Sequence, residues 1–194
     1  MESSKEKIVT ETLSLIADFI APIGPVIHTL QFPTTISDAI FEYKLKKLLK
    51  NQKPDLMEWL KTAWKFEHCQ EEYAANVRKL ICFLNAMNED KLIDIYANLL
   101  HAYQLEFINQ DEFFRLSWIL TQVYSDDLFL LKDFKHKTKY SENKRLEILE
   151  PYGLIDKHHR RGYNSQTATK YLLTETGKKM LACGIDYENY NEYK

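Results

Sequence analysis

The sequence predicts a mainly α-helical protein, in which a multi-helix body precedes a C-terminal winged-helix-like module that carries one β-hairpin. Three observations lead to this fold class. Apolar residues recur at helical spacing through residues 1–125, glycine and proline occur only five times each, and near Asp126 the pattern changes to short helices that flank two strands. A chain of 194 residues, 45% hydrophobic and 28% charged, can bury a substantial core.

The chain opens with an amphipathic segment. Ser3 and Glu6 have the spacing of a capping box. Apolar residues then recur at helical intervals, at Val9, Leu13, Ile16 and Ile20. The prolines and the glycine of the following run, APIGPVIHTLQFP, end this helix.

Residues 13–32 are apolar enough for membrane contact to be considered. A helix that crosses a bilayer needs about 20 uninterrupted apolar residues, whereas Asp18, His28 and the prolines Pro22 and Pro25 interrupt this run. The sequence therefore argues against a membrane span. Docking at a membrane interface or on a partner stays open, beside burial against the protein's own core.

Four further helices are expected in the body, over residues 34–50, about 55–84, 91–108 and 109–124. Each carries apolar residues along one face, which is the pattern of helices that pack on other helices. The expected buried residues are Phe41, Leu45, Leu48, Leu60, Trp64, Tyr73, Val77, Leu80, Ile81, Leu84, Leu92, Ile95, Leu99, Ala102, Phe113, Leu116, Ile119, Leu120 and Val123.

The winged-helix-like module is expected over residues 126–183. Ser125 is the predicted cap of its first helix, with two aspartates in the first turn, where the helix dipole favours negative charge. A shorter helix at about 142–152 follows. Two strands, LIDKHH and KYLLT, are then joined by a loop around Gly162, and TETGKKMLACG forms a last helix. This order of elements is that of a winged helix, a relative of the helix-turn-helix.

Charge is distributed unevenly along the chain. The formal net charge is −2, so overall basicity gives no sign of nucleic-acid binding. Residues 126–183 nevertheless hold 12 Lys and Arg against 8 Asp and Glu, a net charge of +4. Residues 1–125 carry −4, and the tyrosine-rich tail, residues 184–194, carries −2. The basic residues are therefore concentrated in the C-terminal module.

The basic residues in and before the hairpin are candidates for nucleic-acid binding, because Lys and Arg that neutralise phosphates supply most non-specific affinity. The helix at 142–152 would have to read the bases, but it carries three glutamates against Lys144 and Arg145. Solvation of a surface hairpin by charged side chains explains the same pattern. The candidate residues are Lys135, Lys137, Lys139, Lys144, Arg145, Lys157, His159, Arg160, Arg161, Tyr163 and Lys170.

No set of residues in the sequence marks a catalytic, metal or cofactor site. There is no G-x-S-x-G motif, and the glycines never cluster into a phosphate-binding loop. Adjacent His–Cys and His–His pairs lack the spacing of metal ligands. The three cysteines, Cys69, Cys82 and Cys183, are scattered without a CxxC, which favours reduced thiols and a cytoplasmic location. We therefore expect a protein that is not an enzyme and needs no cofactor.

The stretch IDIYANLLHAYQLEFINQDEFFRLSWILTQVYSDDLFLLKDF resembles the middle of the Abi-alpha-type proteins, a bacterial family linked by name to abortive infection. In that family an acidic helix with an "anLL" core precedes a helix that ends in "iLxqLsxxDxxlL". The matching positions are residues 96–100, 119–123 and 126–131.

The family's final segment, "LxxLGLi … YxLTxxGxxF", is similar to residues 146–155 and 171–181. This chain departs from it at Tyr152, before the glycine, and at Met180 and Leu181, where an aromatic residue often stands. The shared motifs are structural, so the resemblance implies a winged-helix-like end and a role in phage defence but no catalytic residue.

Two classes of function follow from the sequence. One is a non-enzymatic interaction protein in bacterial phage defence or its regulation, which acts through contacts with a partner protein or a second copy. The alternative is a winged-helix regulator that binds nucleic acid with the basic hairpin, residues 157–170. The dimeric state would discriminate in part, because helix-turn-helix proteins usually present two reading heads at a fixed spacing.

Overall fold

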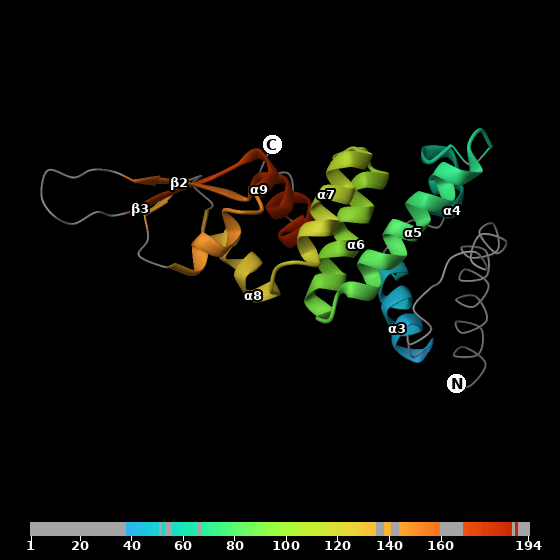
Figure 1. Ribbon diagram of the computed structural model, residues 1–194, viewed down its shortest axis with the longest axis horizontal. Helices are drawn as coiled ribbons and strands as arrows, with labels where there is room; N and C mark the ends of the chain where they lie inside the picture. Colours follow the sequence, from blue (N-terminus) through green and yellow to red (C-terminus); the bar gives the residue numbers. More distant parts are fainter. Residues whose placement is uncertain are drawn as a thin grey trace, which may run out of the picture. The chain divides into compact units, whose positions relative to one another are not determined.

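The computed structural model describes residues 38–50, 52, 56–65, 67–134, 138–140, 144–159, 169–187 and 189 (Figure 1). The chain divides into two compact units, Met1–Asn85 and Ala86–Lys194. The expected N-terminal helix and the apolar segment 13–32 lie outside the described residues. Within the described part of the chain, no helix is long and apolar enough to cross a membrane.

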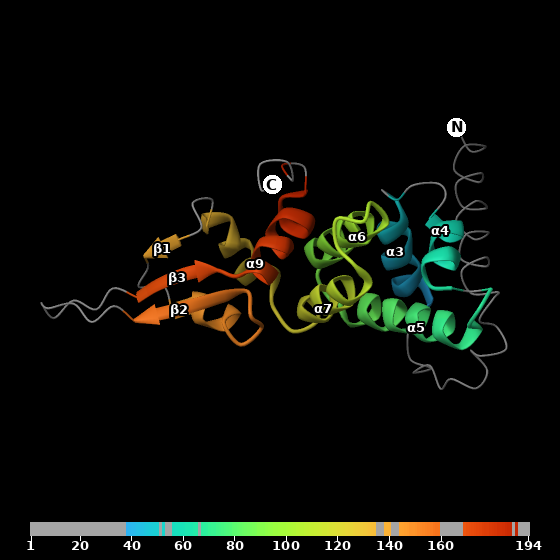
Figure 2. The same cartoon turned by 90° about the horizontal axis from the view of Figure 1, so that it is seen from above.

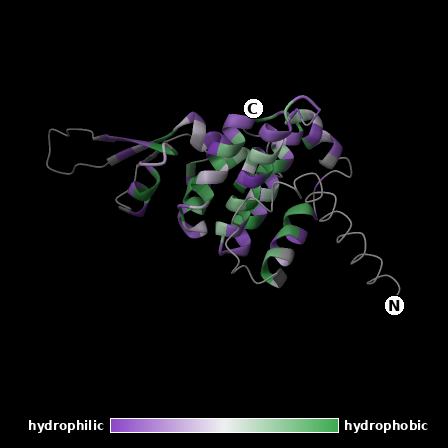
Figure 3. Cartoon of the chain, turned by 45° about the vertical axis from the view of Figure 1, so that its right-hand side comes forward, coloured by the Kyte–Doolittle hydropathy of each residue, from purple (hydrophilic) through white to green (hydrophobic). Residues whose placement is uncertain are grey.

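In the first unit the structure describes α3 (Asp38–Leu49), α4 (Leu56–Ala63) and α5 (Gln70–Ala86). Hydrophobic and hydrophilic residues alternate along the helices, as the amphipathic pattern predicts (Figure 3). Phe41, expected in the core, is only half-buried. The predicted residues of this unit that are buried are Leu45, Leu48, Leu60, Trp64, Tyr73, Val77, Leu80, Ile81 and Leu84.

The single helix expected over residues 55–84 is interrupted between α4 and α5. Lys65 adopts a φ of 54°, a left-handed conformation that commonly ends a helix. Trp64, just before it, is fully buried, and its ring lies 6.1 Å from that of Tyr73. Apolar periodicity continues on both sides of the break, which is why the sequence pattern indicates one helix.

In the second unit, α6 (Asp90–Gln104) and α7 (Gln110–Leu120) pack on each other. A capping box begins α7: the Asn109 side chain accepts from the backbone N–H of Glu112, and the Glu112 carboxylate accepts from that of Asn109. Phe113 stacks on Tyr96 and Tyr103, with ring centroids 5.7 and 5.2 Å apart. The aromatic stack fixes the two helices side by side.

The C-terminal module follows α7, and its predicted hairpin is confirmed. Its elements are α8 (Ser125–Leu128), the 3-10 helix η2 (Phe129–Phe134), β1 (Thr138–Tyr140), the 3-10 helix η3 (Lys144–Leu149), β2 (Ile155–His159), β3 (Thr169–Leu173), α9 (Glu175–Lys179) and the π-helix η4 (Met180–Ile185). The strands form an antiparallel sheet in the order β1-β3-β2, with β3 in the middle (Figure 2).

Three details of this module differ from the sequence-based expectation. The strand β1 was not predicted. The helix expected at 142–152 is the short 3-10 helix η3. Tyr124, not Ser125, occupies the N-cap of α8, and the Ser125 hydroxyl instead donates to the Glu89 carboxylate. The two aspartates do lie in the first turn of α8, as predicted.

The division into units lies earlier than the boundary expected near residue 125. The helix α6 contacts η4 at the end of the chain more extensively than it contacts α7. The side-chain amide of Asn98 on α6 donates to the carbonyl of Gly184, at 2.8 Å. These contacts place α6 and α7 in the same unit as the hairpin. They also order the start of the expected tail, since Gly184 and Ile185 are buried.

The three cysteines differ in exposure, and we expect their reactivity to differ accordingly. Cys69 and Cys82 are exposed, whereas Cys183 is buried in η4, where burial raises the pKa of its thiol to about 11. Because the thiolate is the reacting species, iodoacetamide at about pH 8 should modify two thiols rapidly and Cys183 only after unfolding. Mass spectrometry of timed digests measures this. Equal rates at all three thiols would contradict it.

Candidate interaction surface

The predicted nucleic-acid-binding residues fall into three groups in the structure. Lys135, Lys137, Arg160, Arg161 and Tyr163 lie outside the described residues. For Lys139, Lys144 and His159 only the backbone is described. Side chains are described for Arg145, Lys157 and Lys170. Two of these three are held by carboxylates of the same unit.

Arg145, at the start of η3, binds the carboxylate of Asp127 in α8. Its Nε and Nη2 atoms lie 3.0 and 2.5 Å from the same Asp127 oxygen. The Asp127 side chain is 7% exposed, whereas that of Arg145 is 57% exposed. The guanidinium therefore neutralises a buried carboxylate and ties α8 to η3. This ion pair accounts for an arginine at position 145, so no contact with a phosphate is needed to explain it.

Lys157, in the middle of β2, makes an ion pair with Glu147 of η3, with Nζ 2.8 Å from the carboxylate oxygen. The hydrogen bond to Glu147 raises the pKa of Lys157. The hydroxyl of Tyr171, opposite Lys157 in the sheet, lies 3.5 Å from the same Glu147 oxygen. The Glu147 carboxylate thus accepts hydrogen bonds from both polar side chains, Lys157 and Tyr171, on the face of the sheet that covers η3.

The other face of the sheet is open to solvent. Asp156 and His158 on β2 are exposed, and Lys170 on β3 lies opposite His158 in the register. Because strand residues alternate between faces, Lys157 and Lys170 stand on opposite sides of the sheet. The described basic residues therefore do not form one continuous cationic surface.

A different exposed surface lies between α7 and the turn that precedes β2. Trp118 on α7 is 47% exposed, and its ring lies 6.0 Å from the ring of Tyr152 with a tilt of 59° between the two planes. The Tyr152 hydroxyl is 3.4 Å from the backbone carbonyl of Gln122. A Cβ built on Gly153 would lie 3.4 Å from Nη2 of Arg115. We call Arg115, Trp118, Gln122 and Tyr152 the Trp118–Tyr152 surface.

Helix periodicity places two of these residues, Arg115 and Trp118, together. Arg115, Trp118 and Gln122 are all exposed; Arg115 and Trp118, three residues apart, lie on one face of α7, and Gln122 follows in the turn after its C-cap, Thr121. The buried face consists of Phe113, Leu116, Ile119 and Leu120. The signal that could have identified Trp118 from sequence is that this tryptophan falls outside the apolar stripe of its own helix.

The turn that carries Tyr152 is fixed by glycine and threonine. Gly153 has a φ of 66°, which a residue with a Cβ adopts only at a cost. The hydroxyl of Thr174 lies 2.6 Å from the Gly153 carbonyl oxygen and 3.1 Å from that of Leu154, and it accepts from the Gly177 N–H. The position of Tyr152 is thus set by a connection to the cap of α9.

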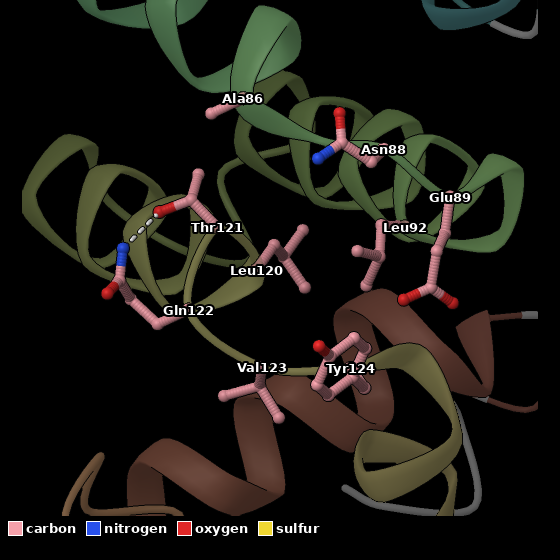
Figure 4. Close-up of a pocket in the computed structure, with 9 residues that line it drawn as sticks. All are labelled: Ala86, Asn88, Glu89, Leu92, Leu120, Thr121, Gln122, Val123 and Tyr124. Carbon is pink, nitrogen blue, oxygen red and sulfur yellow. Dashed lines mark hydrogen bonds between the residues drawn. The ribbon is translucent and has the colours of Figure 1, made fainter.

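A pocket of about 260 Å³ adjoins the Trp118–Tyr152 surface at Gln122. Leu92 and Leu120 lie in its centre, with Glu89 and Tyr124 at one side and Thr121 and Gln122 at the other (Figure 4). Glu89 is already engaged by the backbone N–H and the hydroxyl of Ser125. Tyr124 is 75% exposed at the rim. The lining is mixed, with Leu92 and Leu120 among polar side chains, and Gln122 is the residue it shares with the Trp118–Tyr152 surface.

Glu112, on the side of α7 near α9, forms an ion pair with Lys179. Burial raises the pKa of Glu112, but the hydrogen bonds from Lys179 and from the backbone N–H of Asn109 outweigh it and lower the pKa overall. A carboxyl with a lowered folded-state pKa stabilises the fold above its unfolded pKa, and this contribution disappears as the pH falls through the folded-state value.

We therefore expect Glu112→Gln, which keeps a capping acceptor, to lower the free energy of unfolding at neutral pH. The difference from wild type should shrink as the pH falls from about 6 to about 3. Urea unfolding at a series of pH values measures it. A difference that stays constant through this range would contradict the ionic role of Glu112.

Among the described residues, no group of three His, Cys, Asp or Glu side chains is placed to hold a metal ion. Fold and surface together define a mainly helical protein with a hairpin near its C-terminal end and an exposed tryptophan that contacts a half-buried tyrosine. Comparison of the chain with protein-family models, with curated proteins and with solved structures finds no match.

Proposed function

We propose that this chain is a non-enzymatic interaction protein that binds a partner protein through the Trp118–Tyr152 surface. The observation that carries the proposal is the tilted ring pair of the exposed Trp118 and the half-buried Tyr152 beside Arg115, which has no ion pair among the described residues. Trp, Tyr and Arg are the residue types that dominate binding energy at protein interfaces. The resemblance to Abi-alpha-type proteins favours a setting in bacterial phage defence or its regulation.

The charge arrangement favours this function over nucleic-acid binding. Arg145 and Lys157 are paired with carboxylates, so phosphate contact would have to displace an intramolecular partner. Lys157 and Lys170 lie on opposite faces of the sheet. A phosphate-binding hairpin would instead need several cations free on one surface.

Substitution of Trp118 should weaken partner capture. We expect Trp118→Ala to weaken binding by at least about tenfold, because truncation of an interface tryptophan commonly removes about 2 kcal/mol or more. The tagged full-length chain would be recovered from cells of its source, its partner identified by mass spectrometry, and the affinity of the purified pair measured by calorimetry for each variant.

Ile148→Ala is the matched control. Ile148 is a large apolar residue on η3 that is 45% exposed and does not belong to this surface. Equal affinity of wild type and Trp118→Ala would refute the proposal. The alternative function is tested in parallel by fluorescence anisotropy with a random DNA duplex at low and near-physiological salt. Salt-sensitive micromolar binding that is lost in Arg160→Ala/Arg161→Ala would favour the hairpin.

A further inference from the structure

The strand β2 forms one edge of the three-stranded sheet, because the strand order is β1-β3-β2 (Figure 2). An edge strand carries a row of backbone N–H and C=O groups to which a further strand can add. Proteins commonly protect such edges by keeping the edge strand short. The opposite edge, β1, has three residues, whereas β2 has five in unbroken register with β3.

The register determines which backbone groups of β2 point outward. The Thr174 N–H donates to the Leu154 carbonyl at 3.2 Å, and hydrogen-bonded pairs in an antiparallel ladder recur at every second residue. Asp156 and His158 therefore bond to β3. Within the described part of the chain, β3 is the only strand that pairs with β2. The backbone groups that point outward belong to Ile155, Lys157 and His159.

The sequence of β2 is complementary to itself in antiparallel pairing. With Lys157 opposite Lys157 of a second copy, every outward N–H and C=O of the two strands meets a partner. Asp156 and His158, both on the exposed face, then lie opposite His158 and Asp156 of the second copy. The imidazole donates a ring N–H to the carboxylate, and cross-strand pairs of this kind stabilise a sheet.

The same two side chains specify the register. Moving the two-fold axis by one residue along β2 would place Asp156 opposite Asp156, or His158 opposite His158. Like charges directly opposite destabilise a sheet, so the axis at Lys157 is the favoured one. A lysine on an edge strand commonly discourages pairing. Here its ammonium is bound to Glu147 at 2.8 Å, on the face that covers η3, so the copies meet at this position as neutral ion pairs.

We infer that β2 pairs antiparallel with β2 of a second copy, across a two-fold axis at Lys157, so that the two sheets become continuous. This interface is separate from the Trp118–Tyr152 surface. The inference therefore goes beyond the proposed function and does not rest on it.

Two charge variants of the full-length chain test the pairing and its register. Asp156→Lys places a cation opposite His158 of the second copy, and His158→Asp places two carboxylates opposite each other. Each variant alone should dimerise at least about tenfold more weakly than wild type, because the change occurs twice across the axis. An equal mixture of the two should recover dimers, since the new lysine of one chain then faces the new aspartate of the other. Sedimentation equilibrium measures all four samples.

Asp94→Lys is the matched control, because it makes the same charge change at an exposed residue of α6, and it should dimerise as wild type does. His159→Pro gives a second test. It removes an outward N–H and keeps the β2–β3 ladder, so it should weaken the dimer while circular dichroism shows the fold unchanged. A wild type that stays monomeric at about 200 µM, charge variants that dimerise like wild type, or a mixture that recovers no dimers would each overturn the inference.

Discussion

Gly177→Ala should destabilise the C-terminal unit by about 3 kcal/mol, although alanine is favoured over glycine in helices by about 1 kcal/mol. A Cβ built on Gly177 would lie 2.0 Å from the carbonyl oxygen of Leu154 and 2.8 Å from Cδ1 of Leu173. Overpacking of this kind usually costs about 1–3 kcal/mol, and more where backbone must move. The close approach of α9 to the backbone of Leu154, just before β2, therefore reverses the usual sign of this substitution.

The backbone at Leu154 has little freedom to yield. Its carbonyl accepts from the backbone N–H of Thr174 at 3.2 Å and from the Thr174 hydroxyl at 3.1 Å. An alanine at 177 must separate α9 from Leu154, in the turn that also carries Tyr152, so the strain reaches Tyr152. We expect Gly177→Ala to lower the affinity of the Trp118–Tyr152 surface for its partner as well as the stability of the fold.

Hydrogen exchange at the amides of β2 and β3 is the appropriate measurement, because it reports on this unit alone. Gly184→Ala serves as a control. Its added Cβ would meet a methyl group of Ile95 at 2.8 Å and no backbone atom, so its cost should be smaller. Exchange rates in Gly177→Ala equal to those of wild type would contradict the prediction.

The sequence predicted those parts of the fold that local pattern determines. The strands were predicted because apolar and β-forming residues lie between turn signals, and the structure contains them as β2 and β3. Helical periodicity correctly identified the buried face of α7. In both cases a short run of residues carries enough information to define the element.

The parts that were missed depend on contacts between distant residues. Thr138–Tyr140 is too short to be recognised as a strand, and it forms one only because Leu172 and its neighbours in β3 pair with it. The division after Asn85 depends on the packing of α6 against η4, at the end of the chain. Such contacts leave no periodic signal in the sequence.

The candidate nucleic-acid site was predicted from residue types, and the type of a residue does not show which side chain it pairs with in the fold. Arg145 and Lys157 are basic residues near a hairpin, which is consistent with phosphate binding. The structure pairs them with Asp127 and Glu147. Trp118 belongs to no sequence motif, and its signal in the sequence is only its position outside the predicted apolar face of its own helix.

Arg145→Ala should lower the free energy of unfolding by about 2 kcal/mol. The substitution leaves the Asp127 carboxylate, which is 7% exposed, without its cation. Removing one partner of a fully buried pair costs about 3–5 kcal/mol. We expect less because the Arg145 side chain is 57% exposed, so water can replace part of the guanidinium.

The adjacent aspartate provides a matched control for this prediction. Asp126 pairs with Lys91 at 3.1 Å, and both side chains are more than half exposed, so Lys91→Ala should cost about 1 kcal/mol or less. Adding Asp127→Asn to Arg145→Ala should recover stability, because the double variant no longer holds an unpaired buried charge. Urea unfolding of wild type, Lys91→Ala, Arg145→Ala and the double variant measures these differences. It decides whether Arg145 stabilises the fold or is free to contact phosphate. If Arg145→Ala is as stable as wild type, the guanidinium is not held in place for the fold, and its exposed position again favours a contact with phosphate.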